Sequence, residues 1–511
     1  MPELSKHTRM YREKLLADPY RPGYHFAIPD GDGRPGDPNG AFFADGRYHL
    51  MYLYRSEITN RFQWGHISSH DLLHWRHHPD ALMEGTDSFE GYFSGGGFVD
   101  DDGTAYISFW AFPSEKNDGG IGIAYSKPPY EVWEQIDPIP IEGNRNPWGT
   151  KTISRDGITE HISCADPSNI WKKDGWYYMQ CGNLPVLDAW GRKADSEAKY
   201  QGDWTDLFRS KDMKNWEHVQ RFYENPHPGE DWPDASEDDM CPSFLQLPDK
   251  AAGGELTDKW FQLFISHNKG AQYYIGELKG EKFYPEQHGR FSWVDNTCFA
   301  PEALIDPRNR LIGWFWLLDN PSNEGGLSQY EWTGVYSFPR VFWLENGTLH
   351  MAPAEELDRL QYNHQSLYLG VVDKKRMIDV KNGASFRLKA TIKPNEARKI
   401  GFIVRADDEN GEYTEIYVDR LENALVMDTS KSGLDGRKTV EKAPLKLGDD
   451  DIYMDIFVDK SVIEVYVNNV QAICRRVYPT DVNKATKVYA ISDGADYRTV
   501  NAWEMMETNM Y

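Results

Sequence analysis

A hairpin pattern that recurs five times constrains this chain more than any other feature. Each copy has a short polar corner, an apolar strand, a turn and then an aromatic-rich strand, and the copies begin near residues 37, 93, 166, 241 and 300. Asp-Gly pairs, a strong hairpin signal, mark three of the turns, at Asp45-Gly46, Asp102-Gly103 and Asp174-Gly175. The spacing of roughly 55 to 75 residues leaves room for one four-stranded antiparallel sheet in each copy.

Five such units in series predict an all-β chain with a five-bladed β-propeller. The innermost strands of a propeller line a central axis, so the polar corners would meet at one mouth of that axis. We expect the propeller, with an N-terminal extension, to be the catalytic domain over residues 1–350. A linker with a short helix would follow over 351–365. Regular short strands over 366–511 predict a β-sandwich without catalytic groups.

The charge and the cysteines narrow the class of partner. Acidic residues outnumber basic ones by 80 to 56, which gives a net charge of −24. Nucleic acids and anionic membranes bind basic faces, so we expect neither as a partner, whereas a small neutral carbohydrate fits. The polar N-terminus shows no secretory signal, and the five cysteines form no disulfide framework or CxxC pair. We therefore expect a cytoplasmic protein, as a monomer or a small homo-oligomer.

Acidic residues stand at three of the five corners. Asp37 lies in GDPNG, Asp166 lies in ADPSN, and the run Glu237-Asp238-Asp239 precedes Met240-Cys241-Pro242. Any one of these corners could be an ordinary turn, because Asp side chains bond to nearby backbone amides. Acids that converge on one axis repel one another, and a ligand, a metal or a shared proton must offset that repulsion. Two carboxyl groups about 5 Å apart are what retaining glycoside hydrolysis requires.

Aromatic residues make up 14% of the chain. Most of them are expected to fill β-cores, since aromatic side chains favour strands. Trp64, Trp110 and Trp316 lie near the polar corners. There they would stack on sugar rings and exclude water.

The motifs resemble those of glycoside hydrolase family 32, the β-fructosidases. GDPNGAFFADGRYHLMYLYR is similar to the family's nucleophile motif, FSGGG (residues 93–97) to its Phe-Ser-Gly motif, and CADPSNIW stands where the family has Arg-Asp-Pro. Further stretches match in order along nearly the whole chain. The resemblance implies the same propeller and sandwich, with Asp37 as the nucleophile and Asp166 as the transition-state stabiliser. Substrate contacts are expected from Asn39, Trp64, Phe93, Ser94, Trp110, Asp238, Glu302 and Trp316.

The chain departs from the family's pattern at three positions. Gly36 replaces the Asn that commonly precedes the nucleophile, and Ala165 replaces the Arg of Arg-Asp-Pro. The family's acid is a Glu directly before Cys-Pro, and that position is Met240, which cannot donate a proton. We expect Glu237 to be the general acid/base, carried inward by a bulge or an altered loop. The alternatives are Asp238, Asp239, Glu302 or no functional acid.

No metal and no cofactor are expected. DGDGRPGD (residues 30–37) loosely resembles a calcium loop but lacks the Glu of an EF-hand. The strand–loop–strand context favours a structural role for the histidines between residues 66 and 78, which are His66, His70, His74, His77 and His78. His161 and His267 could contact substrate or pack in the interior, and the sequence does not separate the two.

These features predict a retaining glycoside hydrolase that acts on β-fructofuranosides through a covalent fructosyl-enzyme. Sucrose, short fructo-oligosaccharides and difructose anhydride-type sugars are the expected substrates. The alternatives are a fructosyltransferase that uses the same intermediate, a relative acting on arabinosides or xylosides, and a non-catalytic sugar-binding propeller. Ala165 and Met240 favour loss of catalysis, whereas Asp37 and Asp166 argue against it, because a binding protein has no need of the nucleophile.

Overall fold

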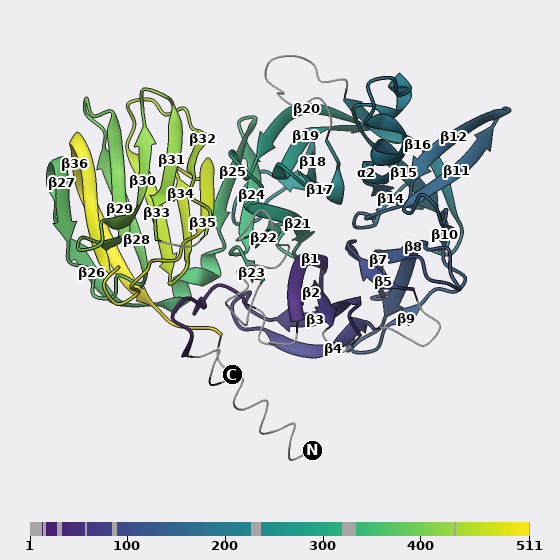
Figure 1. Ribbon diagram of the computed structural model, residues 1–511, viewed down its shortest axis with the longest axis horizontal. Coiled ribbons are helices and arrows are strands. Elements are labelled where there is room, and N and C mark those ends of the chain that lie inside the picture. Colours follow the sequence, from purple (N-terminus) through teal and green to yellow (C-terminus); the bar gives the residue numbers. More distant parts are fainter. Residues whose placement is uncertain are drawn as a thin grey trace. The chain divides into compact units, whose positions relative to one another are not determined.

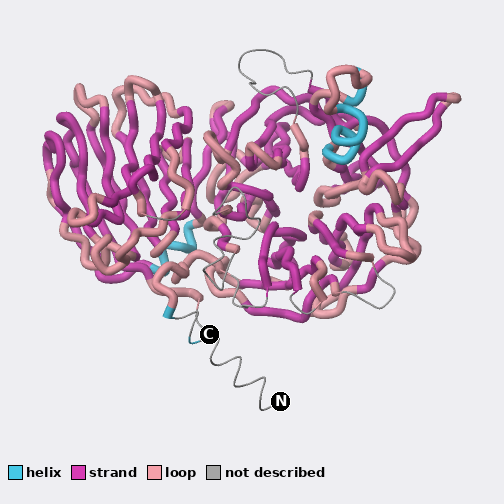
Figure 2. The backbone as a smooth tube through the Cα atoms, viewed as in Figure 1, coloured by secondary structure: helices cyan, strands magenta, loops and turns pink. Residues whose placement is uncertain are grey.

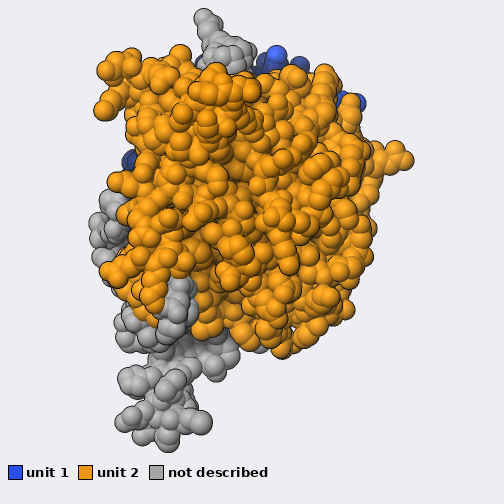
Figure 3. All heavy atoms as spheres, turned by 90° about the vertical axis from the view of Figure 1, so that its right-hand side faces the viewer, with its two compact units in different colours: residues 1–34, 291–298, 316–511 blue, residues 35–290, 299–315 orange. Residues whose placement is uncertain are grey.

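The computed structural model describes residues 13, 17–27, 33–56, 59–83, 89–225, 237–318, 334–433 and 436–509. The chain divides into two compact units, coloured in Figure 3. The propeller unit comprises residues 35–290 and 299–315, and the C-terminal unit comprises residues 1–34, 291–298 and 316–511. Strands make up most of the described chain (Figure 2), with short helices such as η2 (Ala198–Tyr200) and η3 (Glu355–Leu360). The loosely calcium-like stretch lies partly outside the described residues, which resume at Gly33.

Five successive sheets correspond to the five repeats, and the first four follow one another around a common centre in Figure 1. Blade 1 contains β1 (Gly33–Ala44), β2 (Arg47–Ser56), β3 (Phe62–Ser69) and β4 (Arg76–Leu82). Blade 2 contains β5 (Gly91–Phe93), β6 (Gly97–Val99), β7 (Ala105–Phe112), β8 (Gly120–Ser126), β9 (Glu134–Gln135) and β10 (Ile141–Glu142). A separate hairpin, β11 (Thr150–Arg155) and β12 (Ile158–Ser163), leads to blade 3.

Blade 3 contains β13 (Trp171–Lys173), β14 (Trp176–Cys181), β15 (Asp203–Ser210) and β16 (Trp216–Asn225). Blade 4 contains β17 (Met240–Pro248), β18 (Leu256–Ser266), β19 (Gly270–Lys279) and β20 (Lys282–Arg290). The fifth sheet contains β21 (Cys298–Ile305), β22 (Leu311–Leu317), β23 (Val335–Tyr336), β24 (Arg340–Glu345) and β25 (Thr348–Pro353). The predicted all-β, five-bladed propeller is confirmed.

Two of the Asp-Gly pairs adopt the left-handed backbone conformation that a two-residue hairpin turn needs. Asp174 and Gly175 have φ values of 51° and 72°, and Lys173 pairs with Trp176 across them, which is a two-residue hairpin with both central residues left-handed. Asp45 and Gly46 have φ values of 50° and 70°, in the same left-handed region. The turn at Asp102-Gly103 is longer: the last paired residues of its hairpin are Val99 and Ala105, and residues 100–104 form the loop between them.

Neighbouring blades are joined near the axis, beginning with blades 1 to 3. The Gly40 N–H donates a hydrogen bond to the Gly95 carbonyl over 3.2 Å, and the Ser108 hydroxyl donates to the Ser168 carbonyl over 2.8 Å. The glycines of FSGGG make this approach possible. A Cβ on Gly96 would lie 2.2 Å from the Asn169 nitrogen, and one on Gly95 would lie 2.0 Å from the Ser108 carbonyl oxygen. Glycine is therefore required at Gly96 for the approach of blades 2 and 3, and at Gly95 for packing within blade 2.

The same kind of contact continues through blades 3, 4 and 5 and returns to blade 1. The Asn169 amide accepts from the Phe244 N–H over 2.7 Å and donates to the Phe244 carbonyl over 3.0 Å. Glu302 of β21 accepts a hydrogen bond from the Ala41 N–H of β1 over 2.8 Å, and its second oxygen lies 3.4 Å from the Ser243 hydroxyl of β17. These contacts complete a ring through the innermost strands and fix the positions of the corners.

The C-terminal unit contains a sheet-rich domain that begins at β26. One sheet runs in the order β32-β31-β30-β29-β36-β28-β33-β34-β35, and β26 and β27 also pair with β36. The long strand β36 pairs with β29 through its first half and with β28 through its second half. The strands are β26 (Gln361–Leu367), β27 (Gly370–Ile378), β28 (Ser385–Lys393), β29 (Lys399–Asp407), β30 (Glu412–Asp419), β31 (Ala424–Lys431), β32 (Val440–Pro444), β33 (Ile452–Asp459), β34 (Val462–Val467), β35 (Gln471–Arg476) and β36 (Lys487–Met505).

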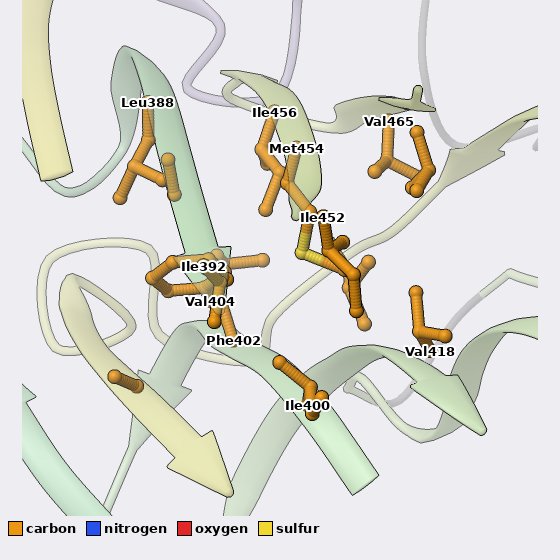
Figure 4. Packing of buried hydrophobic residues seen from close by; sticks show 14 of the residues in the cluster. Leu388, Ile392, Ile400, Phe402, Val404, Val418, Ile452, Met454, Ile456 and Val465 are labelled. Atoms are coloured by element: carbon orange, nitrogen blue, oxygen red, sulfur yellow. The ribbon is translucent and has the colours of Figure 1, made fainter. Parts of the chain in front are cut away.

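An apolar core fills this domain. Side chains from several of these strands meet in one buried cluster, shown in Figure 4. Leu388 and Phe402 come from β28 and β29, and Ile456 and Val465 come from β33 and β34, all of them fully buried. Strands at both ends of the sheet order thus contribute to one core, as expected for a sandwich. No helix in the described part of the chain has the length and apolar character of a membrane span.

Candidate active site

Asp37 and Asp166 meet at Cys241. Asp37 lies on β1, and Asp166 lies just before β13 with a φ of 42°. The Cys241 Sγ atom is 3.7 Å from Asp37 Oδ2 and 3.5 Å from Asp166 Oδ2, and the Cys241 N–H donates to Asp166 Oδ2 over 3.4 Å. First strands from blades 1 and 4 and the corner of blade 3 thus bring the two acids into one site.

The proximity of these acids changes their protonation. Burial and the charge of Asp37 raise the pKa of Asp166 to about 7, against the opposing charge of His267 and hydrogen bonds from Cys241. Burial and the same two acids raise the pKa of the Cys241 thiol well above its ordinary value, so the thiol stays protonated. One of the two carboxyl groups can therefore hold a proton near neutral pH.

Two of the predicted substrate contacts hold the strand that carries Asp37. Ser94, which is buried, donates a hydrogen bond to Asp37 Oδ2. Asn39, also buried, donates to the Asp37 carbonyl over 3.1 Å and accepts from the Gly95 N–H over 3.1 Å. These bonds fix the corner that carries Asp37 and orient its carboxylate.

Glu237 lies in a polar network inside blade 4. Its Oε2 atom accepts hydrogen bonds from the Ser266 hydroxyl and, over 2.8 Å, from the Gln272 amide. Its Oε1 atom lies 3.3 Å from Lys269 Nζ and 3.8 Å from an Arg290 guanidinium nitrogen. Burial raises the pKa of this carboxyl group. The side-chain contacts of Glu237 are thus with β18, β19, β20 and the turn between β18 and β19, and its backbone N–H donates a hydrogen bond to Asp203 of β15 over 2.6 Å.

Asp238 forms a different set of contacts, with Arg192 and His267. Its Oδ1 atom accepts from Arg192 over 3.1 Å, and its Oδ2 atom accepts from the His267 N–H over 2.8 Å and lies 3.1 Å from His267 Nδ1. Burial raises the pKa of Asp238, but the hydrogen bonds from His267 outweigh it and lower that pKa overall. The lowered pKa favours the ionised form of Asp238 beside the Arg192 guanidinium and the His267 imidazole.

Asp239, the third acid of the run, lies in the interior. It has a φ of 52°, is fully buried and accepts a hydrogen bond from the Tyr223 hydroxyl. Burial, reinforced by the charge of Asp203, raises its pKa well above the ordinary value. The left-handed backbone at Asp239 and again at Cys241, where φ is 48°, turns successive side chains of this run to different sides.

The aromatic residues divide into two groups. Trp64 is fully buried and packs against Phe109 in the core of blades 1 and 2, and Trp316 is buried in the C-terminal unit. Phe93 and Trp110 are half-buried, with ring centroids 5.4 Å apart, and Phe93 directly precedes Ser94. The partly exposed rings next to the Asp37 corner are therefore Phe93 and Trp110.

Sequence reasoning missed Arg192 and left His267 undecided. Arg192 stands 46 residues before Asp238, in an insertion between β14 and β15 that contains no recognisable motif. His267 stands 29 residues after Asp238, in the turn between β18 and β19. Only the folded chain brings the three together, so no spacing rule could have identified them.

Three histidines of blade 1 form the one group of described residues with enough close donor atoms for a metal ion. His49, His66 and His78 come from β2, β3 and β4, and their ligand atoms lie within 4.8 Å of one another. His49 Nδ1 and His66 Nε2 are 2.9 Å apart, and His78 Nε2 is 2.6 Å from the Ser68 hydroxyl. Burial lowers the pKa of all three imidazoles. Neutral rings form these hydrogen bonds through one nitrogen each, and the second ring nitrogens (His49 Nε2, His66 Nδ1 and His78 Nδ1) have no hydrogen-bond partner among the described residues.

Comparison with known proteins gives consistent matches along the chain. The model of the glycosyl hydrolases family 32 N-terminal domain matches residues 31–353, and that of the family 32 C-terminal region matches residues 356–504. The sucrose-6-phosphate hydrolase of Zymomonas mobilis subsp. mobilis is 25% identical over 526 residues, covering 98% of this chain and 94% of that protein. The levanase of Bacillus subtilis is 25% identical over 521 residues, covering 94% of this chain and 70% of that protein.

Solved structures share the fold. The fructan 1-exohydrolase IIa of Cichorium intybus, solved with 1-kestose, matches with a TM-score of 0.77 at 20% identity and covers 96% of this chain and 98% of that one. The sucrose-6-phosphate hydrolase of Lactobacillus gasseri matches with a TM-score of 0.75 at 20% identity, covering 99% and 97%. Both shared folds extend over nearly the whole length of each chain.

Proposed function

This chain belongs to glycosyl hydrolase family 32, and from that membership we propose that it is a retaining β-fructofuranosidase. Its substrates would be short β-fructofuranosides such as sucrose, small fructo-oligosaccharides or difructose anhydride-type sugars. The curated relatives include proteins named sucrose-6-phosphate hydrolase and levanase, which supports a fructoside as substrate.

The observation that carries this proposal is the convergence of Asp37 and Asp166 on Cys241. Asp37, oriented by Ser94, attacks the anomeric carbon and forms a covalent fructosyl-enzyme. Asp166 accepts hydrogen bonds from fructosyl hydroxyl groups and favours the positive charge that develops in the transition state. Binding of those hydroxyl groups and the nearby His267 charge favour the ionised form of Asp166, which offsets its raised pKa.

We also propose that the protein works in the cytoplasm on imported sugars. All five cysteines are free and buried, which suits a reducing compartment. Phe93 and Trp110 would pack against the sugar beside the nucleophile. Glu237 stays the predicted proton donor.

A product assay tests the proposal. The purified protein is incubated with sucrose and with 1-kestose, and fresh product is followed by proton NMR, which distinguishes the anomer of fructose that is released first. We expect Asp37→Asn to lower kcat by several orders of magnitude, while circular dichroism and the melting temperature stay unchanged. Asp45→Asn is the matched control, because Asn tolerates the left-handed φ of 50° at that exposed turn. Normal turnover by Asp37→Asn would refute the covalent role.

A further inference from the structure

We propose that His267, held by Asp238, is the proton donor of this site and takes the place of the family's Glu at Met240. This inference rests on the proposed glycosidase function and names a catalytic residue for it. A Met at the expected position leaves the leaving-group oxygen without an acid. Two residues before Met240, Asp238 contacts both Arg192 and His267, and this arrangement can supply the missing acid.

The geometry of the pair orients the ring. Asp238 Oδ2 accepts the His267 backbone N–H over 2.8 Å and lies 3.1 Å from Nδ1 of the same residue. A carboxylate at Nδ1 holds the proton on that nitrogen and directs Nε2 away from Asp238. Arg192 fixes the other oxygen of Asp238, and the Phe299 ring packs edge-on against the imidazole with centroids 5.8 Å apart. The imidazole is thus positioned on two sides, yet 50% of its surface is exposed, so substrate can reach it.

The surrounding charges favour the protonated form of this imidazole, which is the form that can donate a proton. Burial lowers the pKa of His267, but the Asp238 hydrogen bond and the charges of Asp238, Asp166 and Asp37 raise it overall. The Asp37 and Asp166 carboxyl groups are thus near enough for their charges to act on the ring, and the charge of His267 in turn lowers the pKa of Asp166. Phe299 adds no charge, Arg192 acts through Asp238, and Lys269 of the same turn pairs with Glu237.

The other candidates are less suited to the role. The pKa of Asp238 is lowered, so this group is a poor acid near neutral pH. Glu237 accepts hydrogen bonds from Ser266 and Gln272, and Lys269 pairs with its second oxygen, so both oxygens are engaged within blade 4. A protonated His267 needs no such rearrangement to present a proton.

With His267 as the proton donor, the reaction proceeds in two steps. In the first step Asp37 forms a bond to the anomeric carbon, the bond from that carbon to the glycosidic oxygen breaks, and the His267 Nε2 proton moves to the leaving oxygen. In the second step His267 Nε2 takes a proton from water, the water oxygen bonds to the anomeric carbon, and the bond to Asp37 breaks. The enzyme returns to its starting state.

The experiment compares two substrates in matched variants. Sucrose has a poor leaving group that needs a proton, whereas a nitrophenyl β-fructofuranoside has a good one that does not. We expect His267→Gln to lower kcat/KM on sucrose by about 10²- to 10⁴-fold and on the aryl substrate by less than about tenfold. His70→Gln, at an exposed histidine bonded to the Gly46 carbonyl, is the control and leaves both rates unchanged.

The pH profile gives a second readout that does not remove the ring. The wild-type rate on sucrose falls at high pH as His267 loses its proton. Asp238→Asn removes the charge that raises the pKa of His267, so the alkaline limb moves to lower pH while the ring remains. Asp238 acts here as a positioning residue for His267. If the alkaline limb of the pH profile is the same in Asp238→Asn as in wild type, Asp238 does not set the pKa of the proton donor.

The outcomes separate this inference from the proposed function. If Glu237→Gln or Asp166→Asn shows the loss on sucrose with sparing of the aryl substrate, and His267→Gln does not, the donor is that acid and the His267 assignment is wrong. If Asp37→Asn keeps its activity on both substrates, the proposed covalent mechanism fails whatever His267 does. Equal losses on both substrates in a folded His267→Gln assign His267 to substrate binding and also overturn the proposal.

Discussion

Cys241 contacts Asp166 twice, through its backbone N–H at 3.4 Å and through its thiol at 3.5 Å from the same carboxylate oxygen. The thiol is a weak donor, so this contact replaces little of the hydration that Asp166 loses on burial. The charge of Asp37 adds to that cost, and together they raise the pKa of Asp166 to about 7.

Replacing Asp166 should therefore stabilise the fold while it removes activity. The folded state holds the Asp166 proton up to about pH 7, whereas the unfolded chain loses it near its ordinary value of 3.8, so stability falls as pH rises between these values. Asp166→Asn cannot lose a proton, so we expect it to unfold at a higher urea concentration than wild type at about pH 8 and to gain little at about pH 4. Turnover of sucrose should fall by orders of magnitude. A variant equally or less stable at the higher pH would contradict this account.

Substitutions of Glu302 test whether this side chain joins β21 to β1 and β17. Burial raises the pKa of Glu302 well above its ordinary value, so the group is neutral and resembles Gln in shape and hydrogen bonding. We expect Glu302→Gln to fold normally and to resist alkaline pH better than wild type, because it has no proton to lose. Glu302→Ala leaves the buried Ala41 N–H without its acceptor and opens a cavity, so urea unfolding should show a loss of about 2–5 kcal/mol. Equal stability of the Gln and Ala variants would argue against the bridging role.

The histidines of blade 1 predict sensitivity to acid. Burial lowers the pKa of His49 to about 3, against an ordinary value of 6.5. The unfolded chain therefore binds more protons than the folded chain between these values, and stability should be full above about pH 6.5 and fall as the pH drops. In a melting-temperature series, His49→Gln should show a shallower acid dependence than wild type. Added zinc ions should leave the wild-type curve unchanged. A large zinc-dependent rise, absent in His49→Gln, would instead reveal a metal site.

The close approach of blades 2 and 3 predicts that Gly96 tolerates no side chain. A Cβ at that position would lie 2.2 Å from the Asn169 backbone nitrogen, three residues from Asp166. We expect Gly96→Ala to unfold the protein or to lower kcat on sucrose strongly by displacing Asp166. Gly91→Ala is the matched control, since its Cβ would meet its nearest atoms at an ordinary 3.5 Å. Crystal structures or melting curves of both variants would decide the point.

Most of the fold could be predicted from local sequence patterns. Asp-Gly pairs such as Asp174-Gly175 determine the backbone conformation of a turn within a few residues, so they mark the hairpins directly. The family resemblance is confirmed, and it pointed to Asp37 and Asp166, which the structure brings together. The surroundings of Glu237 could not be predicted in this way. Its partners Ser266 and Gln272 lie 29 and 35 residues away, and the backbone turns at Asp239 and Cys241 decide where each acid of the run points.

The aromatic residues show a second limit. Trp64 follows a polar corner in the sequence and was expected to stack on sugar, yet it is fully buried in the core. Its neighbours Phe109 and Gly40 come from other strands. Burial depends on such distant contacts, which the order of residues along one strand does not contain.

The hydrogen bond between Ala41 and Glu302 spans 261 residues of chain. During synthesis on the ribosome, the first blade is made long before the residue that completes its innermost edge. Loop closure over such a separation is slow, and the unpaired edge is open to wrong partners until it happens. The strand that carries Asp37 therefore acquires its final partner only after most of the chain has been synthesised. Chains truncated before Glu302 should be substrates for chaperones and proteases rather than slow enzymes.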